Sequence, residues 1–376
     1  MSEIDRKLTV LVPRPRGSAA SSSGAAATAV LPETAAVPPS LPSASSRAHS
    51  SQADRHGLWP YVQIARVDHW FKNAFMMLGT ILALFYQPSL FAWSSVTPFL
   101  LAVAATCLIA SSNYVLNEIL DAPTDRLHPE KRYRPVPAGK VRLPLAYAEW
   151  LLLGIAGLAL ALSINWYFAF SGLALWLLGV TYNVPPLRTK EWPYIDVLSE
   201  SANNAVRLLL GWFALVTTAV PPVSLALSYW MLGAFFMATK RFAEYRHIGD
   251  KAIAAGYRRS FRHYTEERLL VSMFFYATAC ALFGGIFIVR YHLELILFVP
   301  FAAGVFAYYL SIGLKADSAA QNPEKLYKQR GFFAYMVVST VVFVLLMFTS
   351  IPTLYRMFNV ESSIASPLWT LGGESK

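Results

Sequence analysis

The stretch NEILDAPTD, residues 117–125, closes one of the longest apolar runs of the chain. The run begins near Val96 and is long enough to cross a membrane as a helix. Three carboxylates, Glu118, Asp121 and Asp125, therefore stand where this helix leaves the apolar region. The cation-rich sequence RLHPEKRYRPVPAGK follows directly, so both signs of charge gather at one helix end.

The composition of the whole chain indicates a membrane protein. Of 376 residues, 55% are hydrophobic, 14% aromatic and only 14% charged, which is far from the usual soluble balance. The two cysteines, Cys107 and Cys280, both lie in apolar runs, so we interpret them as packing residues rather than as a disulfide or metal site. The net charge of +10 has a simple source in cytoplasmic loops.

Both ends of the chain differ from the apolar middle. Residues 1–58 are rich in Ala, Ser and Pro, and we predict a disordered, cytosolic tail there. The apolar cluster LTVLV in this tail is too short for a signal-peptide core. Residues 59–352 form the predicted transmembrane domain, and residues 353–376 a short external tail.

The apolar segments predict an all-α membrane protein with nine transmembrane helices. Lys and Arg gather in alternate loops, within 126–142, 188–190, 240–268 and 315–330, with Arg290 as the clear exception. This alternation predicts a cytoplasmic N-terminus and an external C-terminus, and it argues against nucleic-acid binding. The nine predicted spans are 73–93, 96–120, 143–163, 164–183, 195–220, 222–242, 269–289, 292–314 and 331–351.

Asn117, Asp121 and Asp125 recur at a spacing of four residues. On a helix this spacing drifts by only about 40° per step, so the three side chains line one face. Carboxylates in such a row can hold Mg²⁺ ions that bridge the phosphates of a diphosphate. Pro123 is predicted to kink or end the helix, in which case Asp125 approaches from the loop. The alternative is that these carboxylates are ordinary membrane-surface groups paired with Arg126 and Lys131.

The motif N-x-x-x-D-x-x-x-D, the nine predicted spans and the sequence HPEKRYRP (128–135) resemble the UbiA superfamily of intramembrane transferases over residues 60–350. The resemblance implies a ring of nine helices around a cavity that opens to the cytoplasm and to lipid. It also implies that Asn117, Asp121 and Asp125 are catalytic, with Asp121 and Asp125 as Mg²⁺ ligands for the donor's diphosphate. Glu118 departs from the Asp that is more usual at its position.

Most members of this superfamily have a second Asp-rich motif after the sixth span, and this chain has MATKRFAEYRHIGD (237–250) there instead. Together with RVDHWFKN (66–73), HPEKRYRP and HYTEE (263–267), this resembles the branch that uses phosphoribosyl diphosphate as donor and a polyprenyl phosphate, such as decaprenyl phosphate, as acceptor. The expected location is a bacterial inner membrane. Compared with a prenyl diphosphate and its acceptor, these two substrates bring two further phosphate groups into the site, and these call for cations such as Lys240 and Arg241. The positive charge that usually flanks a cytoplasmic helix end also accounts for both residues.

The expected reaction is an in-line displacement at the anomeric carbon of the ribose. The acceptor phosphate is already anionic, so no strong general base is needed. Asn117 is expected to orient the diphosphate or a metal-bound water, and Glu244 to fix Lys240 or Arg241 or to bind a ribose hydroxyl. The phosphates are expected to divide among Lys131, Arg132, Arg134, Lys240 and Arg241.

One segment favours a prenyl diphosphate instead. TYNVPPLRTK (181–190) resembles the Y-x-x-P-P-x-R-x-K loop of the members that use prenyl diphosphates. The fifth span carries Glu200, Asn203, Asn204 and Arg207 at helical spacing, which predicts a stripe facing a cavity, or pairs with neighbouring helices. The remaining predicted substrate-binding residues are Lys72, Asn73, Tyr182, Arg188, Lys190, Asn203, Arg207 and Tyr264.

Two alternatives stay open beside the phosphoribosyl transfer. An aromatic prenyltransferase needs a second acidic set, for which Glu244, Asp250, Glu266 and Glu267 have unsuitable spacing. A transporter is expected to show repeated halves and midplane polar groups, whereas the polar clusters here gather on the cytoplasmic side. The sequence leaves the oligomeric state and the length of the lipid chain open.

Overall fold

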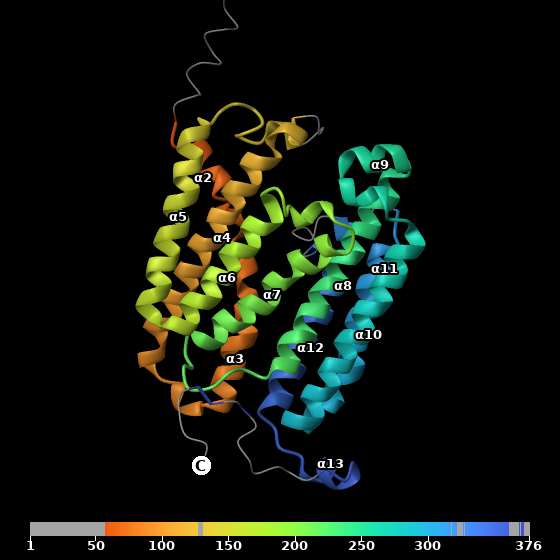
Figure 1. Ribbon diagram of the computed structural model, residues 1–376. Helices are drawn as coiled ribbons and strands as arrows, with labels where there is room; N and C mark the ends of the chain where they lie inside the picture. Colours follow the sequence, from red (N-terminus) through yellow and green to blue (C-terminus); the bar gives the residue numbers. More distant parts are fainter. Residues whose placement is uncertain are drawn as a thin grey trace, which may run out of the picture. The chain divides into compact units, whose positions relative to one another are not determined.

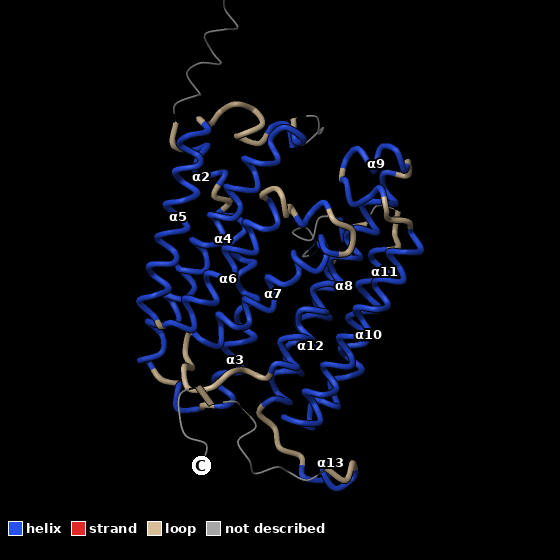
Figure 2. The backbone as a smooth tube through the Cα atoms, viewed as in Figure 1, coloured by secondary structure: helices blue, strands red, loops and turns tan. Residues whose placement is uncertain are grey.

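The computed structural model describes residues 57–126, 131–316, 318–321, 326, 328–360, 368, 370 and 371. The predicted N-terminal tail lies, apart from Gly57 and Leu58, outside the described residues, and so do the first three residues of HPEKRYRP. The described part is helical, with one isolated antiparallel bridge between Ala219 and Thr370. Figure 2 shows the helices and the short loops that join them.

Helices occupy each of the nine segments that the sequence predicts to be spans. The predicted external tail also contains a short helix. In chain order the elements are α2 (Trp59–Ile64), η2 (Val67–Met76), α3 (Met77–Tyr86), η3 (Pro88–Leu90), η4 (Trp93–Ser95), α4 (Val96–Asp125), η5 (Lys131–Tyr133), α5 (Leu143–Ile164), α6 (Trp166–Asn183), η6 (Thr189–Glu191), α7 (Ile195–Phe213), α8 (Val223–Ile248), α9 (Lys251–Tyr257), η7 (Arg259–Arg262), α10 (Glu266–Tyr291), η8 (Leu293–Phe298), α11 (Val299–Gly313), η9 (Ala319–Gln321), α12 (Arg330–Met347) and α13 (Pro352–Met357).

Six of these helical segments are long and apolar enough to cross a membrane on their own. The chain is therefore an integral membrane protein with several candidate spans, and the count of nine stays a prediction. The other three segments are divided or more polar: η2 and α3 divide the first one, α6 ends in Thr181, Tyr182 and Asn183, and α7 carries charged and amide side chains. The six are Trp93–Asp125, Leu143–Ile164, Val223–Ile248, Glu266–Tyr291, Leu293–Gly313 and Arg330–Met347.

Helix α7 connects two groups of packed helices. On one side α4 packs against α5 and α6, and on the other α8 packs against α10 and α11, while α7 contacts both α6 and α8 (Figure 1). Helix α3 crosses α7 at Gly79 and Gly211, where an added Cβ would strike the backbone of Leu208 or Met76. Small residues at such crossings let membrane helices approach closely.

The boundary between the third and fourth predicted spans falls where the sequence places it. Helix α5 ends at Ile164 and α6 begins at Trp166. The Asn165 carboxamide oxygen accepts from the Phe168 amide at 2.9 Å, and its Nδ2 donates to the Phe213 carbonyl at 2.7 Å. Asn165 therefore caps α6 and ties it to α7.

Helix α4 continues through Pro123 to Asp125, so the prediction that Asp125 approaches from the loop is wrong. Pro123 has no backbone N–H to donate to the helix, but it stands in the last turn of α4, so the rest of the helix is unaffected. Val115, Ile119 and Ala122 are buried in a cluster with Ile64 and other apolar side chains, which holds this last part of α4 in place. We call the end where α4, α6 and α8 finish and α7 and α10 begin the polar end.

Candidate functional site

The acidic face of α4 meets cations from two loops at the polar end. Asp125 is buried and forms an ion pair with Arg134 Nη1 at 2.9 Å. The Asp121 side chain is 23% exposed and contacts Lys190 Nζ and, at 3.4 Å, Arg188 Nη2. The carboxylates are thus paired, as the alternative interpretation holds, but with cations other than Arg126 and Lys131.

The segment between α6 and α7 supplies the cations that face Asp121. Lys190 is buried and also donates to the Asn183 carboxamide oxygen at 2.8 Å. Burial lowers the pKa of Lys190, and the nearby Asp121 carboxylate opposes part of that shift. Arg188 Nε lies 2.8 Å from Glu191 Oε1, and Arg188 adopts a positive φ of 29°. The prolyl loop that the sequence singled out therefore folds back onto α4.

Arg241 of α8 is the centre of a buried ion network. It is 1% exposed, and all three of its nitrogen atoms face carboxylates. Nε lies 3.2 Å from Asp196 Oδ2, Nη2 lies 2.9 Å from Glu200 Oε2, and Nη1 lies 3.1 Å from Glu244 Oε2. The sequence-based role of Arg241 as a phosphate ligand does not fit this environment, because the side chain is buried and each of its nitrogens already donates to a carboxylate of the protein. It holds α7 against α8.

Asp196 is the residue of this network that sequence reasoning missed. It is fully buried at the start of α7 and accepts from Tyr264 Oη at 2.6 Å, Ser260 Oγ at 3.2 Å and Arg258 Nη1 at 3.4 Å. Tyr264 was predicted to bind substrate, but it too is fully buried, and burial beside Asp196 raises the pKa of its phenol. The sequence signal that could have identified Asp196 is a lone carboxylate at the start of an apolar helix.

Glu200 links this network to the acidic face of α4. Its Oε2 accepts from Tyr182 Oη at 2.8 Å, and the Tyr182 ring lies 5.9 Å from Lys190 Nζ. Lys190 in turn contacts Asp121. Within the described chain Asp121 is therefore linked to Arg241 through Lys190, Tyr182 and Glu200 rather than by a direct contact.

The remaining predicted cations lie around this site. Lys131 Nζ donates to Tyr257 Oη at 3.1 Å, which joins the segment after α4 to the end of α9. Arg132 is exposed and contacts Tyr133 Oη at 2.7 Å. Lys240 Nζ lies 3.9 Å from Glu244 Oε1, so Glu244 contacts both cations that the sequence proposed for it. Lys72 is partly exposed on η2.

A second polar group lies deeper among the helices. Arg207 of α7 donates from Nε to the Asn73 carboxamide oxygen at 3.1 Å, and Asn73 Nδ2 lies 3.2 Å from Cys107 Sγ. RVDHWFKN is thereby tied to α4 and α7, since Trp70 Nε1 also donates to Ser111 Oγ at 2.9 Å. Asn203 donates to the Glu200 carbonyl of its own helix at 3.0 Å.

The donor set of α4 fits a magnesium ion that arrives with its substrate. Within the described ranges no three His, Cys, Asp or Glu side chains form a self-sufficient metal site. Mg²⁺ in phosphate-handling sites commonly takes one or two carboxylates and completes its shell with phosphate oxygens and water. Asp121, partly exposed, and Asp125 supply such carboxylates, and Asn117 lies one turn away.

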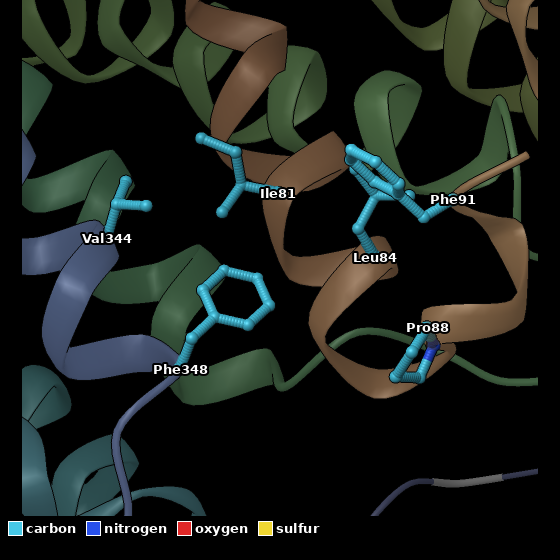
Figure 3. Close-up of a pocket in the computed structure, with 6 residues that line it drawn as sticks. All are labelled: Ile81, Leu84, Pro88, Phe91, Val344 and Phe348. Atoms are coloured by element: carbon cyan, nitrogen blue, oxygen red, sulfur yellow. The ribbon is translucent and has the colours of Figure 1, made fainter.

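An apolar cavity of about 340 Å³ lies far from these charges, at the opposite end of the helices. Figure 3 shows Ile81 and Leu84 of α3 on one side of it and Val344 and Phe348 at the end of α12 on the other. Pro88 and Phe91 complete the lining. None of these six described lining residues is charged, so the cavity suits hydrocarbon rather than a phosphate.

The chain is similar to known membrane transferases. Residues 74–337 match the model of the UbiA prenyltransferase family. The decaprenyl-phosphate phosphoribosyltransferase of Mycobacterium tuberculosis is 29% identical over 231 residues, 60% of this chain and 72% of that protein. The protoheme IX farnesyltransferase of Korarchaeum cryptofilum is 35% identical over 118 residues, 31% of this chain and 38% of that protein.

The structure also resembles solved ones. A UbiA homologue from Archaeoglobus fulgidus bound to DMAPP and Mg²⁺ superimposes with a TM-score of 0.58 at 19% identity, over 77% of this chain and 97% of that chain. The helical arrangement described above is shared with that protein.

Proposed function

The chain belongs to the UbiA prenyltransferase family, and on this basis we propose that it transfers 5-phosphoribose from phosphoribosyl diphosphate to a polyprenyl phosphate, with release of diphosphate. It is a membrane transferase by family. The proposed site is the polar end, which we place on the cytoplasmic side of a bacterial inner membrane, with the N-terminus cytoplasmic and the C-terminus external.

The observation that carries this proposal is the closed network around Arg241. Asp196, Glu200 and Glu244 all contact this one guanidinium, so within the described chain they do not form a second magnesium-binding set. A prenyl diphosphate needs mainly metal to neutralise it, whereas two additional phosphates need cations. The polar end supplies these cations as Lys131, Arg132, Arg134, Arg188, Lys190 and Lys240.

The proposed reaction is a displacement at the anomeric carbon. A phosphate oxygen of the acceptor forms the new bond, and the bond to the diphosphate breaks with its electrons leaving on the diphosphate. Lys190 and Arg188 stabilise that leaving charge, while Asp121 and Asp125 would hold Mg²⁺, which supplies further positive charge when bound. The acceptor oxygen carries no proton to remove, so the residues of this site orient and neutralise charge.

Glu200 is the residue best placed to bind the ribose hydroxyls. Its side chain is 33% exposed, and within the described chain Oε1 has no hydrogen-bond partner while Oε2 accepts from Tyr182 and Arg241. Carboxylates recognise ribose hydroxyls in this way in dinucleotide-binding proteins. Glu244, which the sequence suggested for this role, instead contacts Lys240 and Arg241.

Relatives support both this proposal and one alternative. The decaprenyl-phosphate phosphoribosyltransferase of M. tuberculosis matches 60% of the chain. The contact of the prolyl loop with Asp121, and the short match to a farnesyltransferase, favour a prenyl diphosphate donor with an aromatic acceptor as the second candidate.

One assay separates the two candidates. Purified protein in lipid nanodiscs with Mg²⁺ receives radiolabelled phosphoribosyl diphosphate and decaprenyl phosphate in one tube, and geranyl diphosphate with labelled 4-hydroxybenzoate in another. We expect lipid-extractable label in the first tube only. Product in the second tube alone would overturn the phosphoribosyl assignment.

A further inference from the structure

Arg207 is a buried charge that has no counter-ion among the described residues. It is 9% exposed on α7, and within the described chain it forms no ion pair with a carboxylate. Its Nε donates to Asn73, but its two terminal nitrogens have no hydrogen-bond partner among the residues that the structure describes. A lone charge inside a membrane protein is costly, and such groups typically face a cavity or a ligand.

The surroundings of Arg207 orient it without neutralising it. Asn73 is 3% exposed, and its carboxamide oxygen fixes Nε while its Nδ2 faces the weakly accepting Cys107 sulfur. The planar guanidinium therefore keeps its outer edge, with the terminal N–H groups, for another acceptor. That edge matches the oxygen spacing of a phosphate, which guanidinium groups bind with two parallel hydrogen bonds.

The position of Arg207 along α7 indicates which phosphate it would take. Glu200 and Arg207 are seven residues apart and so share a face of the helix, with Arg207 about 10 Å farther from the polar end. Asn203 and Asn204 lie between them on the same helix, and both are partly exposed. With the donor's leaving diphosphate beside Lys190 and its ribose beside Glu200, as proposed above, Arg207 would lie on the far side of the ribose from the diphosphate.

We propose that Arg207, oriented by Asn73, binds the phosphate of the polyprenyl phosphate acceptor. This rests on the proposed function. A displacement needs the attacking and leaving groups on opposite sides of the anomeric carbon, and this placement provides that geometry. The acceptor enters from the membrane and brings its phosphate to the deeper site, whereas a water-soluble donor enters from the polar end. The acceptor phosphate would also be the negatively charged partner that Arg207 does not have within the described chain.

The first test measures the acceptor without any donor. Farnesyl phosphate serves as a short lipid phosphate, with farnesol as the uncharged comparison, and binding to protein in nanodiscs is followed by calorimetry. We expect Arg207→Gln to weaken farnesyl phosphate binding roughly 10- to 100-fold while farnesol binding stays unchanged. Arg290→Gln, at the exposed end of α10, is the matched control and should bind as the wild type does.

The second test separates the two phosphates in turnover. Arg207→Gln should raise the KM for decaprenyl phosphate by a similar factor and leave the KM for phosphoribosyl diphosphate within about threefold. Arg207→Lys keeps the charge but not the planar edge, so its KM for decaprenyl phosphate should lie between those of the wild type and Arg207→Gln. If Arg207→Gln does not fold, Arg207→Lys is the variant that tests the proposal. A raised donor KM with an unchanged acceptor KM would assign Arg207 to the donor's 5-phosphate and overturn the inference.

The two proposals fail in different ways. Wild-type protein that turns over only prenyl diphosphate refutes the phosphoribosyl function. Wild-type protein that forms the phosphoribosyl lipid, combined with an unchanged acceptor KM in both Arg207 variants, refutes only the assignment of Arg207.

Discussion

Arg241 and Arg207 are both buried arginines within the helical bundle, but their partners are opposite. Arg241 contacts Asp196, Glu200 and Glu244, whereas Arg207 contacts the neutral Asn73 and no carboxylate of the described chain. A guanidinium surrounded by carboxylates has its interactions completed within the protein. One that is left with free N–H groups is ready for a ligand. On our proposal, the chemistry of the partners rather than burial separates a structural cation from a binding cation here.

The largest effect is expected from removing Arg241. Arg241→Ala would remove the cation that Asp196, Glu200 and Glu244 share. Asp196 and Glu244 would keep only their longer ion-pair contacts with Arg258 and Lys240, and losing one partner of a buried ion pair costs about 3–5 kcal/mol. The thermal unfolding midpoint should fall by roughly 5–15 °C. The buried Cys107 and Cys280 allow unfolding to be followed by a thiol-reactive fluorophore.

Arg207→Met is the matched variant for this experiment. It removes a charge that has no counter-ion within the described chain and leaves only the buried Asn73 carboxamide oxygen unpaired, so the same midpoint should fall much less than in Arg241→Ala. Equal destabilisation by Arg241→Ala and Arg207→Met would remove the distinction between the two arginines.

The next largest effect is expected at Asp121, the partly exposed carboxylate of the proposed magnesium site. Asp121→Asn keeps the shape but removes the charge that would hold Mg²⁺, so kcat should fall about 100-fold or more. Asp68→Asn provides the control, because the Asp68 side chain is 71% exposed on η2, and its activity should stay within about twofold of wild type. Thermal midpoints of the two variants should agree. Full activity of Asp121→Asn would exclude Asp121 from the site.

Local periodicity was sufficient to place the acidic face of α4. The four-residue spacing of Asn117, Asp121 and Asp125 depends only on helix geometry, and α4 runs through all three. Asp125 stays on the helix instead of entering the loop because Ile119 and Ala122, just before Pro123, are buried in a tertiary cluster.

The ion network could not be predicted in the same way, because its partners lie far apart in sequence. Asp196 is separated by 45 residues from Arg241 and by 68 from Tyr264, and no periodicity connects them. The sequence gives Arg207 and Arg241 the same appearance, a cation at the edge or inside of an apolar helix. Only the contacts between helices reveal that, within the described chain, Arg241 is neutralised and Arg207 is not.

Lys190 is expected to make the rate of the proposed transfer depend on pH. Burial lowers its pKa, so its positive charge is lost at a lower pH than that of an exposed lysine as the solution becomes alkaline. Phosphoribosyl transfer should therefore decline on the alkaline side below the ordinary lysine range. Lys190→Arg, which keeps its charge throughout, should move that decline to higher pH. An unchanged alkaline limb in kcat/KM for the donor would mean that the charge of Lys190 does not act on the diphosphate.

The smallest effect is expected at Tyr182, whose hydroxyl donates to Glu200 and whose ring lies near Lys190. Tyr182→Phe removes one hydrogen bond to Glu200 Oε2 but leaves the contact of Glu200 with Arg241. Losing one such bond costs about 1 kcal/mol, so the KM for phosphoribosyl diphosphate should rise roughly fivefold while the KM for the lipid acceptor stays constant. Glu200→Gln should change the donor KM in the same direction and by more, because it also removes the charge opposite Arg241. If Tyr182→Phe instead changed only the acceptor KM, Glu200 would lie on the lipid side of the ribose, and the order of substrates along α7 would have to be reversed.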